Sequence, residues 1–213
     1  MPTRVLVADD HGIVRDGLRS ILGVVEDIEV IAIASDGGEA VAKTMDLVPD
    51  VVVMDVSMPR LNGIEATRQL RAQMTDTEVL MLSMHAARDV IMRAFAAGAR
   101  GYMLKDSISD ELIRGVKTVA QGKRFLGKGV AEQIGSGFNE EFGADVLAGL
   151  THPERQILQL IAEGKSNAEA AAILHLSIRT VEAYRSRIMR QLGLKNLPSL
   201  VKFAIRHGII PLV

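Results

Sequence analysis

Five polar side chains in the first half of the chain come directly after short apolar runs: Asp9, Asp10, Asp55, Ser83 and Lys105. Three carboxylates in one crevice would repel one another unless a hard cation relieved the repulsion. Mg²⁺ suits such a site because it takes one or two carboxylates and keeps several waters. An aspartate can also act as a nucleophile and form an aspartyl phosphate. The cation, a lysine and a hydroxyl would then neutralise charge on the phosphoryl oxygens. These residue types indicate phosphoryl transfer to a carboxylate.

The segments that would position these residues alternate between two kinds of hydrophobic pattern. Short apolar runs without polar alternation are typical of strands buried on both faces of a parallel sheet. They are Val5–Ala8, Val30–Ala34, Val51–Met54, Val79–Leu82 and Tyr102–Leu104. Between them, apolar residues recur at helical spacing in five stripes; the first begins at Ile13 and the weakest ends at Met45. The pattern predicts an α/β domain, a doubly wound five-stranded parallel sheet of the flavodoxin-like kind with right-handed crossovers.

The predicted topology brings the polar residues together. In the strand order 2-1-3-4-5, strands 1 and 3 are neighbours where the order reverses, and ligands bind there, outside the carboxyl ends of the strands. A helix cap or a loop position would be enough to explain Asp9 or Ser83 alone. It does not explain five such residues at the ends of strands that flank one crevice.

The composition excludes several classes of protein. The chain has 213 residues, which allows one or two domains, and it has no cysteine. A disulfide framework and cysteine-ligated zinc or iron–sulfur sites are therefore excluded. The apolar run Val5–Ala8 is too short for a signal peptide, and no stretch approaches the ~20 apolar residues of a membrane helix. We expect a cytoplasmic protein without a membrane partner.

The C-terminal part differs from the rest of the chain in net charge and in hydrophobic pattern. Residues 151–213 carry nine Lys/Arg against four Asp/Glu, a net charge of +5, whereas the remainder carries sixteen against twenty-two, a net charge of −6. A basic domain on an acidic body favours a polyanionic partner, although scattered surface charge would give the same numbers. Seven glycines among residues 122–149 indicate a flexible linker, with a short helix around Val130–Ile134. We expect domains at 1–121 and 150–213.

From Thr151 onward the spacing predicts an all-α domain of four helices. Thr151 and Glu154 form a capping-box pattern that opens the first helix, and Gly164 ends it. Ser166 or Asn167 caps the second helix. A tight turn at residues 175–177 leads to a third helix at 178–192, and a fourth begins near 197–198. A short turn between two short helices is typical of a helix-turn-helix.

The third helix of this set has an apolar side and a polar side. Val181, Ile188 and Leu192 share one side, and the opposite side is small and polar at first and basic at its end. Such a face can enter a major groove while its arginines meet phosphates, although an ordinary solvated helix has the same pattern. The candidate DNA-binding residues are Arg179, Thr180, Glu182, Ala183, Arg185, Ser186, Arg187 and Arg190.

The N-terminal motifs resemble a response-regulator receiver of the NarL/FixJ type. They are VADDH (7–11), MDVSMPRLNG (54–63), MLS (81–83) and GYMLK (101–105), and the resemblance spans residues 4–121. It implies that Asp55 is the phosphoacceptor. It also implies that Asp10, Asp55 and the backbone carbonyl of Ser57 bind Mg²⁺ directly, and that Asp9 acts through metal-bound water.

The same resemblance gives roles to residues beside the acids. Ser83 and Lys105 would contact the phosphoryl group, and Ser83 with Tyr102 would form the switch that responds to it. A packed aromatic without a switching role explains Tyr102 equally well. Asp106 follows Lys105 where many receivers have proline, and Ser83 replaces a commoner threonine. We interpret His11 as a helix-start residue and not as a ligand.

Residues 151–194 are similar to the LuxR-type helix-turn-helix, with SNAEAAAIL (166–174) matching the positioning helix and residues 177–194 the recognition helix. Pro153, Glu182 and Tyr184 depart from the residues usual in that family, so the operator sequence is not predicted. Glu182 could accept a hydrogen bond from cytosine N4. The implied partners are a sensor histidine kinase, double-stranded DNA and RNA polymerase, with a homodimer forming on phosphorylation.

Three other functions fit the sequence less well than a non-enzymatic transcription regulator does. A phosphoaspartate hydrolase of the haloacid-dehalogenase type needs Asp-x-Asp around the nucleophile, and Ser57 stands where the second acid would be. A flavodoxin-like electron carrier is disfavoured because the chain has only seven aromatic residues and no Trp. A phosphorylation-independent regulator would not need the complete set of pocket residues.

Overall fold

A parallel sheet forms the centre of the N-terminal domain in the computed structural model, which describes residues 1–73, 76–84, 86–134, 146–147 and 149–211. Its strands are β1 (Thr3–Ala8), β2 (Ile28–Ala34), β3 (Val51–Asp55), β4 (Glu78–Ser83), β5 (Gly101–Leu104) and β6 (Phe125–Leu126). Their order is β2-β1-β3-β4-β5-β6, and every neighbouring pair is parallel. The predicted order of the first five strands is confirmed. The prediction of five strands was wrong by one, because the two residues of β6 are too few to show a strand pattern.

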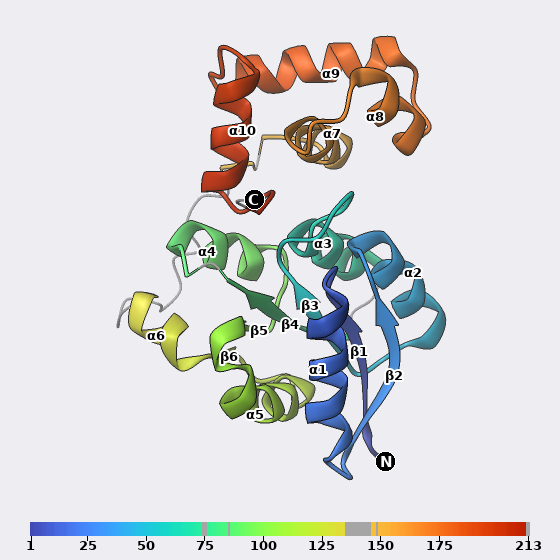
Figure 1. Cartoon of the computed structure of the whole chain (residues 1–213), viewed down its shortest axis with the longest axis vertical. Helices are drawn as coiled ribbons and strands as arrows, with labels where there is room; N and C mark the ends of the chain where they lie inside the picture. The colour runs from blue at the N-terminus through green and yellow to red at the C-terminus, as the bar shows by residue number, and fades with distance from the viewer. Residues whose placement is uncertain (74–75, 85, 135–145, 148, 212–213) are drawn as a thin grey trace.

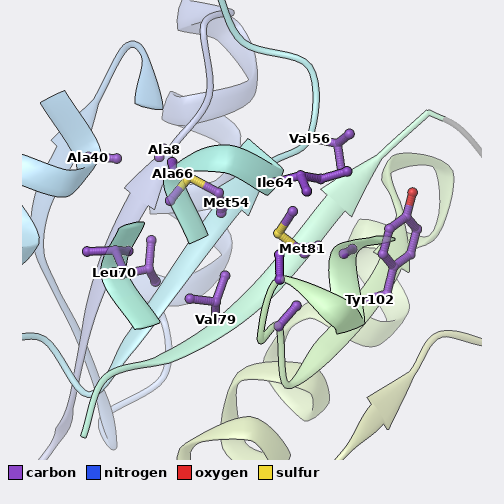
Figure 2. Packing of buried hydrophobic residues seen from close by; sticks show 14 of the residues in the cluster. Ala8, Ala40, Met54, Val56, Ile64, Ala66, Leu70, Val79, Met81 and Tyr102 are labelled. Carbon is purple, nitrogen blue, oxygen red and sulfur yellow. The ribbon is translucent and has the colours of Figure 1, made fainter. Parts of the chain in front are cut away.

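Helices cover both faces of this sheet (Figure 1). On one face lie α1 (Gly12–Gly23) and α5 (Ile108–Ala120), and on the other α2 (Gly37–Leu47), α3 (Gly63–Gln73) and α4 (Arg88–Ala96). Successive side chains of a strand point to opposite faces. Val5 and Val7 of β1 therefore pack toward α1 and α5, whereas Leu6 and Ala8 belong to the core under α2, α3 and α4, part of which is drawn in Figure 2.

Two residues of the predicted apolar stripes lie outside the core. Ile13 is 90% exposed and Met45 is 40% exposed. The side chains that α1 buries against the sheet are Leu18 and Leu22, further along the helix. A stripe read from spacing is wider than the strip of helix surface that the sheet can cover, so its margins stay in solvent.

Part of the interval predicted to be a flexible linker is ordered structure. Within residues 122–149, β6 pairs with β5, and α6 (Lys128–Ile134) follows it and buries Val130 in the core beneath α4. The predicted short helix is confirmed, whereas the prediction of flexibility from residue 122 was wrong. Residues 135–145 and 148 of the predicted linker lie outside the described residues.

The C-terminal domain consists of the four predicted helices: α7 (His152–Ala162), α8 (Asn167–Leu174), α9 (Ile178–Gln191) and α10 (Leu197–Arg206). Glu154 Oε2 accepts hydrogen bonds from the backbone N–H and the hydroxyl of Thr151, at 2.8 and 2.7 Å, which satisfies an unpaired donor at the start of α7. Gly164 ends the α7 region at φ 85°, a left-handed conformation that favours glycine. Among the described residues, no helix has the length and apolar character needed to span a bilayer.

Candidate functional site

The acidic pocket forms at the carboxyl ends of β1, β3 and β5. Asp55 is the last residue of β3 and is 2% exposed, and Asp9, just after β1, is fully buried. Lys105 Nζ lies 2.7 Å from Asp9 Oδ2 and 3.0 Å from Asp55 Oδ2. Burial lowers the pKa of Lys105, but the two carboxylates outweigh burial and raise it. Lys105 therefore stays charged between the two acids.

The same surroundings set the protonation of Asp55. Burial raises the pKa of Asp55 to about 7, and the charge of Asp9 adds to this, while Lys105 and a hydrogen bond from the Ser57 backbone N–H oppose it. A carboxylate with so little hydration needs a further positive charge to be fully ionised at neutral pH. A cation bound in the pocket would therefore stabilise the ionised form of Asp55.

The donor set fits a hard divalent cation. Ligand atoms of Asp9, Asp10, His11 and Asp55 all lie within 4.8 Å of one another. Three of the four donors are carboxylate oxygens, which Mg²⁺ prefers. His11 precedes α1 as its N-cap, as the sequence predicted, but its Nδ1 also lies 2.8 Å from Asp10 Oδ1. Three of the residues predicted to bind Mg²⁺, Asp9, Asp10 and Asp55, therefore lie together.

Ser83 and Tyr102 lie beside the acids, on the neighbouring strands β4 and β5. Both side chains are buried, and the Tyr102 hydroxyl and Ser83 are hydrogen-bonded to one another. Burial raises the pKa of Tyr102, so the phenol stays neutral. Figure 2 shows the Tyr102 ring at the margin of the core cluster that contains Met81 and Ile64. The two predicted switch residues thus contact one another in this structure.

The loop after Asp55 contacts the C-terminal domain, which the sequence did not predict. Gln159 of α7 accepts hydrogen bonds from the backbone N–H and the side-chain amide of Asn62, both at 2.9 Å. Its own amide donates to the backbone carbonyl of Met58 at 2.8 Å. Gln159 is 1% exposed. A residue from the predicted DNA-binding domain therefore holds the loop that leaves the phosphoacceptor strand.

A cleft of about 270 Å³ opens beside the acidic pocket and is shared by the two domains. Its receiver side consists of Asp10, Ser57, Met58 and Pro59, and its other side consists of Ala162, Glu163, Ile210 and Pro211. The end of α7 and the C-terminal segment therefore form one wall of the opening next to Asp10.

Two further groups of contacts join the domains. Glu65 of α3 lies 3.1 Å from Arg155 Nη1 and 3.7 Å from His152 Nδ1, both from α7. Asp89 of α4 lies 2.6 Å from Nδ1 of His207, just after α10. Figure 1 shows the same arrangement, with α7 above α3 and the lower end of α10 beside α4.

One pattern could have indicated this surface. Polar residues recur at 152, 155 and 159 on α7 and at 163 just after it, close to helical spacing. The apolar stripe of the same helix is already provided by Ile157, Leu158 and Ile161. A second, polar stripe of this kind is equally typical of a helix face that is exposed to solvent. The spacing alone therefore does not distinguish a helix face that docks on another domain from one that is exposed to solvent.

The candidate DNA face of α9 is accessible. Val181 and Ile188 are buried as predicted, while six of the eight candidate residues are exposed and Thr180 and Arg185 are partly so. Ser177 caps the helix by accepting a hydrogen bond from the Thr180 N–H at 3.0 Å. Figure 1 shows α9 on the side of its domain away from the receiver, with α7 between them. Docking of the domains leaves this face open.

Two family models match the chain. The response regulator receiver domain matches residues 5–117, and the bacterial regulatory proteins of the luxR family match residues 148–204. The chain is 36% identical over 214 residues to the oxygen regulatory protein NreC of Staphylococcus haemolyticus, covering 97% of this chain and 99% of that protein. It is 37% identical over 207 residues to the transcriptional regulatory protein MctR of Rhizobium johnstonii, covering 97% and 95%.

A solved structure is similar over nearly the whole chain. The crystal structure of the response regulator ChrA of a heme-sensing two-component system is 36% identical, covers 98% of this chain and 99% of that one, and has a TM-score of 0.54. Receiver and helix-turn-helix models both match at the positions where the structure has the acidic pocket and helices α7–α10. The chain belongs to the two-component response regulators of the NarL/FixJ type, DNA-binding transcription regulators that join a receiver domain to a LuxR-type helix-turn-helix.

Proposed function

We propose that Asp55 accepts a phosphoryl group from a sensor histidine kinase, and that this event controls DNA binding by residues 150–213. The observation that carries the proposal is the burial of Asp55 beside Lys105, at the carboxyl ends of β3 and β5. A lone buried carboxylate would be costly. One that faces a fixed ammonium, two further carboxylates and a hydroxyl is arranged for phosphoryl chemistry.

The cation has a defined set of ligands in this proposal. Asp10, Asp55 and the Ser57 carbonyl would hold Mg²⁺, and Asp9 would act through bound water. When bound, the cation offsets the negative charge of the phosphoryl oxygens. The raised pKa of Asp55, about 7, falls when positive charge is added beside it, so the nucleophile becomes fully ionised.

The transfer itself is carried by the chain's own residues. A carboxylate oxygen of Asp55 attacks phosphorus, the P–N bond to the donor imidazole breaks, and the leaving nitrogen takes up a proton. The Lys105 ammonium and the Ser83 hydroxyl donate hydrogen bonds to phosphoryl oxygens. Because Ser83 is hydrogen-bonded to Tyr102, a shift of Ser83 toward the phosphoryl group would release that contact.

The output in this proposal is a DNA-bound homodimer. The exposed residues of α9 read a major groove while Arg187 and Arg190 meet phosphates, and transcription changes through RNA polymerase. A candidate dimer surface on the receiver is α4 with β5. His207 and Gly208 pack against Asp89 and Val90 of α4 in the docked arrangement, so this surface is partly covered until the domains separate.

The test is phosphorylation of the full chain by radiolabelled acetyl phosphate with Mg²⁺. We expect one labelled site per chain, cleaved by alkali and by hydroxylamine as an acyl phosphate is, and no label in Asp55→Asn. Asp50→Asn, at an acid outside the pocket, serves as the matched control and is expected to label normally. Equal labelling of Asp55→Asn and the wild type would show that another residue is the acceptor.

A further inference from the structure

One carboxylate oxygen of Glu154 is held by the cap of α7. Its Oε2 accepts the hydrogen bonds from the backbone N–H and the hydroxyl of Thr151, and the side chain of Glu154 has no exposed surface. A buried carboxylate with one oxygen fixed by two hydrogen bonds has little freedom to move. The second oxygen, Oε1, therefore has a defined position relative to α7.

This second oxygen faces an arginine of the DNA-reading helix. Oε1 of Glu154 lies 3.1 Å from Nε of Arg187 on α9, and within the described part of the chain this is the one ion pair that Arg187 makes. A guanidinium is a rigid planar fork with five N–H donors, of which Nε carries one. The ion pair therefore leaves the four donors of the two Nη nitrogens for another partner.

The outer end of Arg187 lies among the candidate DNA contacts. Residues three and four positions apart are neighbours on a helix, so Arg187 is next to Ala183 and Arg190, which are both exposed. The Arg187 side chain is itself 55% exposed, whereas Glu154 is not exposed at all. Because the carboxylate is buried, the exposed part of the arginine is the part directed away from it, toward the solvent side of α9.

A flexible arginine must be ordered when it binds a phosphate, and this ordering opposes binding. An arginine that a carboxylate already holds loses less freedom. Contacts to phosphates fix the register and orientation of a protein on the duplex. We propose that Glu154 is a positioning residue for DNA recognition: it holds Arg187 so that the Nη nitrogens reach one backbone phosphate and set how α9 lies in the major groove. The proposal rests on the proposed contact between Arg187 and a phosphate.

Two simpler roles of Glu154 predict different results. A residue that only caps α7 would affect folding, and its loss would weaken binding to every DNA sequence equally. A carboxylate that only screened the charge of Arg187 would weaken DNA binding, so its removal would strengthen binding. A positioning residue matters only where the duplex fits the helix. Its loss therefore weakens specific binding and leaves intact the non-specific binding that charge alone supplies.

Glu154→Gln separates these roles. It keeps the size of the side chain and an oxygen for Thr151, since a capping box accepts either residue, but it removes the charge that holds Arg187. We expect binding to a specific duplex to weaken about 2- to 10-fold for each bound protomer, the cost of ordering one such side chain. Binding to a shuffled duplex is expected not to weaken. Glu169→Gln is the matched control, because Glu169 caps α8 through Ser166 in the same way, and it is expected to discriminate between the duplexes as the wild type does.

Fluorescence anisotropy with two labelled duplexes measures this for the full-length chain, in the presence of Mg²⁺ and beryllofluoride, a stand-in for the phosphoryl group on Asp55. One duplex is the sequence that the wild type enriches most from a random pool, and the other is the same sequence shuffled. Adding Glu154→Gln to Arg187→Ala should cause no further loss on the selected duplex, because the side chain to be positioned is gone. Adding it to Arg190→Ala should cause the same loss as in the wild type.

Arg187→Lys tests the same contact from the other partner and leaves the cap of α7 intact, should Glu154→Gln not fold. A lysine keeps the charge but lacks the planar fork, so no rigid group faces Glu154 and a phosphate together. This variant should therefore lose affinity for the selected duplex and keep its affinity for the shuffled one.

Three results would overturn the proposal. One is a folded Glu154→Gln that binds the selected duplex as tightly as the wild type or more tightly. Another is an equal loss on both duplexes, or the same loss in the Arg187→Ala background, since Glu154 then acts through the fold. The third is an Arg187→Lys that binds the selected duplex as the wild type does. Failure of the proposed function looks different, because Arg187→Ala itself would then bind the selected duplex as the wild type does.

Discussion

The Nε atom of Arg187 lies 3.1 Å from Oε1 of Glu154, a carboxylate without exposed surface. This contact joins the DNA face of α9 to the start of α7. Glu154 Oε2 is already bonded to Thr151, so Arg187 supplies the positive charge for the other oxygen. An arginine predicted only to meet phosphates therefore also holds two helices of its domain together.

Arg187→Ala is expected to lose both roles, whereas Arg190→Ala loses one. Removing the cation beside a buried carboxylate leaves that charge uncompensated and destabilises the fold. Both variants of the full chain should bind DNA more weakly, with the salt dependence shallower by about one for each lost phosphate contact. Only Arg187→Ala should lower the midpoint of thermal unfolding of the C-terminal domain. Equal midpoints for the two variants would mean that the ion pair between Arg187 and Glu154 does not contribute to the stability of the domain.

Gly63 is predicted to be intolerant of any side chain because of where it lies against Asp55. A Cβ added there would overlap the backbone carbonyl of Asp55, which cannot yield without moving the phosphoacceptor. Gly63→Ala should cost about 1–3 kcal/mol of stability, as overpacking does, and should weaken beryllofluoride binding. In contrast, Gly17 lies at an exposed position of α1, where an added Cβ meets no atom within 4 Å. Gly17→Ala should therefore stabilise the folded protein by roughly 0.5–1 kcal/mol. Chemical denaturation measures both, and a stable, fully active Gly63→Ala would contradict the prediction.

The arrangement of the pocket could be predicted because local patterns determine it. Each strand is an uninterrupted apolar run, and the strand order of a doubly wound sheet brings the residues after β1, β3 and β5 to one edge. The distances from Lys105 to Asp9 and Asp55 follow from that topology. The helix caps at Thr151 and Ser166 were equally readable, since capping depends on residues three positions apart.

The contacts that dock the domains could not be predicted, because no local pattern encodes them. Asn62 and Gln159 are 97 residues apart, and each polar side chain would be as well satisfied by water as by the other. The position of α6 also depends on β6, which two residues cannot signal. Burial of α7's second face is decided by the complementarity of two surfaces, a property of the folded domains.

Lys105→Ala tests the charge balance of the pocket. Without the ammonium, the buried carboxylates of Asp9 and Asp55 lose the cation that lies within 3.0 Å of each. The variant should be less stable than the wild type in metal-free buffer and should bind Mg²⁺ more tightly, because a positive charge has left the site. Thermal unfolding against Mg²⁺ concentration should therefore show a larger rise for the variant. Lys43→Ala, at the surface pair with Glu39, is the control, and an equal rise in all three proteins would contradict the prediction.

Glu65 gives the domain contact a dependence on pH. Burial raises the pKa of this carboxyl, but His152, whose Nδ1 lies 3.7 Å away, and the charges of Arg155 and Arg68 outweigh burial and hold the pKa below its ordinary value of 4.5. His152 and Arg155 belong to α7, so part of this shift exists only while the domains are docked. A lowered pKa means that the ionised form stabilises docking. That contribution is fully present above pH 4.5 and is lost as the pH falls through the lowered pKa.

Because the chain has no cysteine, Ser20→Cys and Ala172→Cys provide unique sites for dyes on the two domains. Energy transfer between the two dyes reports docking, and recording it from pH 7 to pH 3 measures how docking is lost in acid. The wild type should stay docked down to about pH 4.5 and then separate, while circular dichroism confirms that each domain remains folded. Glu65→Gln keeps the size of the side chain but has no charge to lose. It should be less docked at pH 7, and its difference from the wild type should disappear in acid. Asp89→Asn, at the other interdomain pair, keeps Glu65 intact and should retain the acid transition. If Glu65→Gln and the wild type separate along the same curve, the contact through Glu65 is not what acid breaks, and the transition belongs to another group.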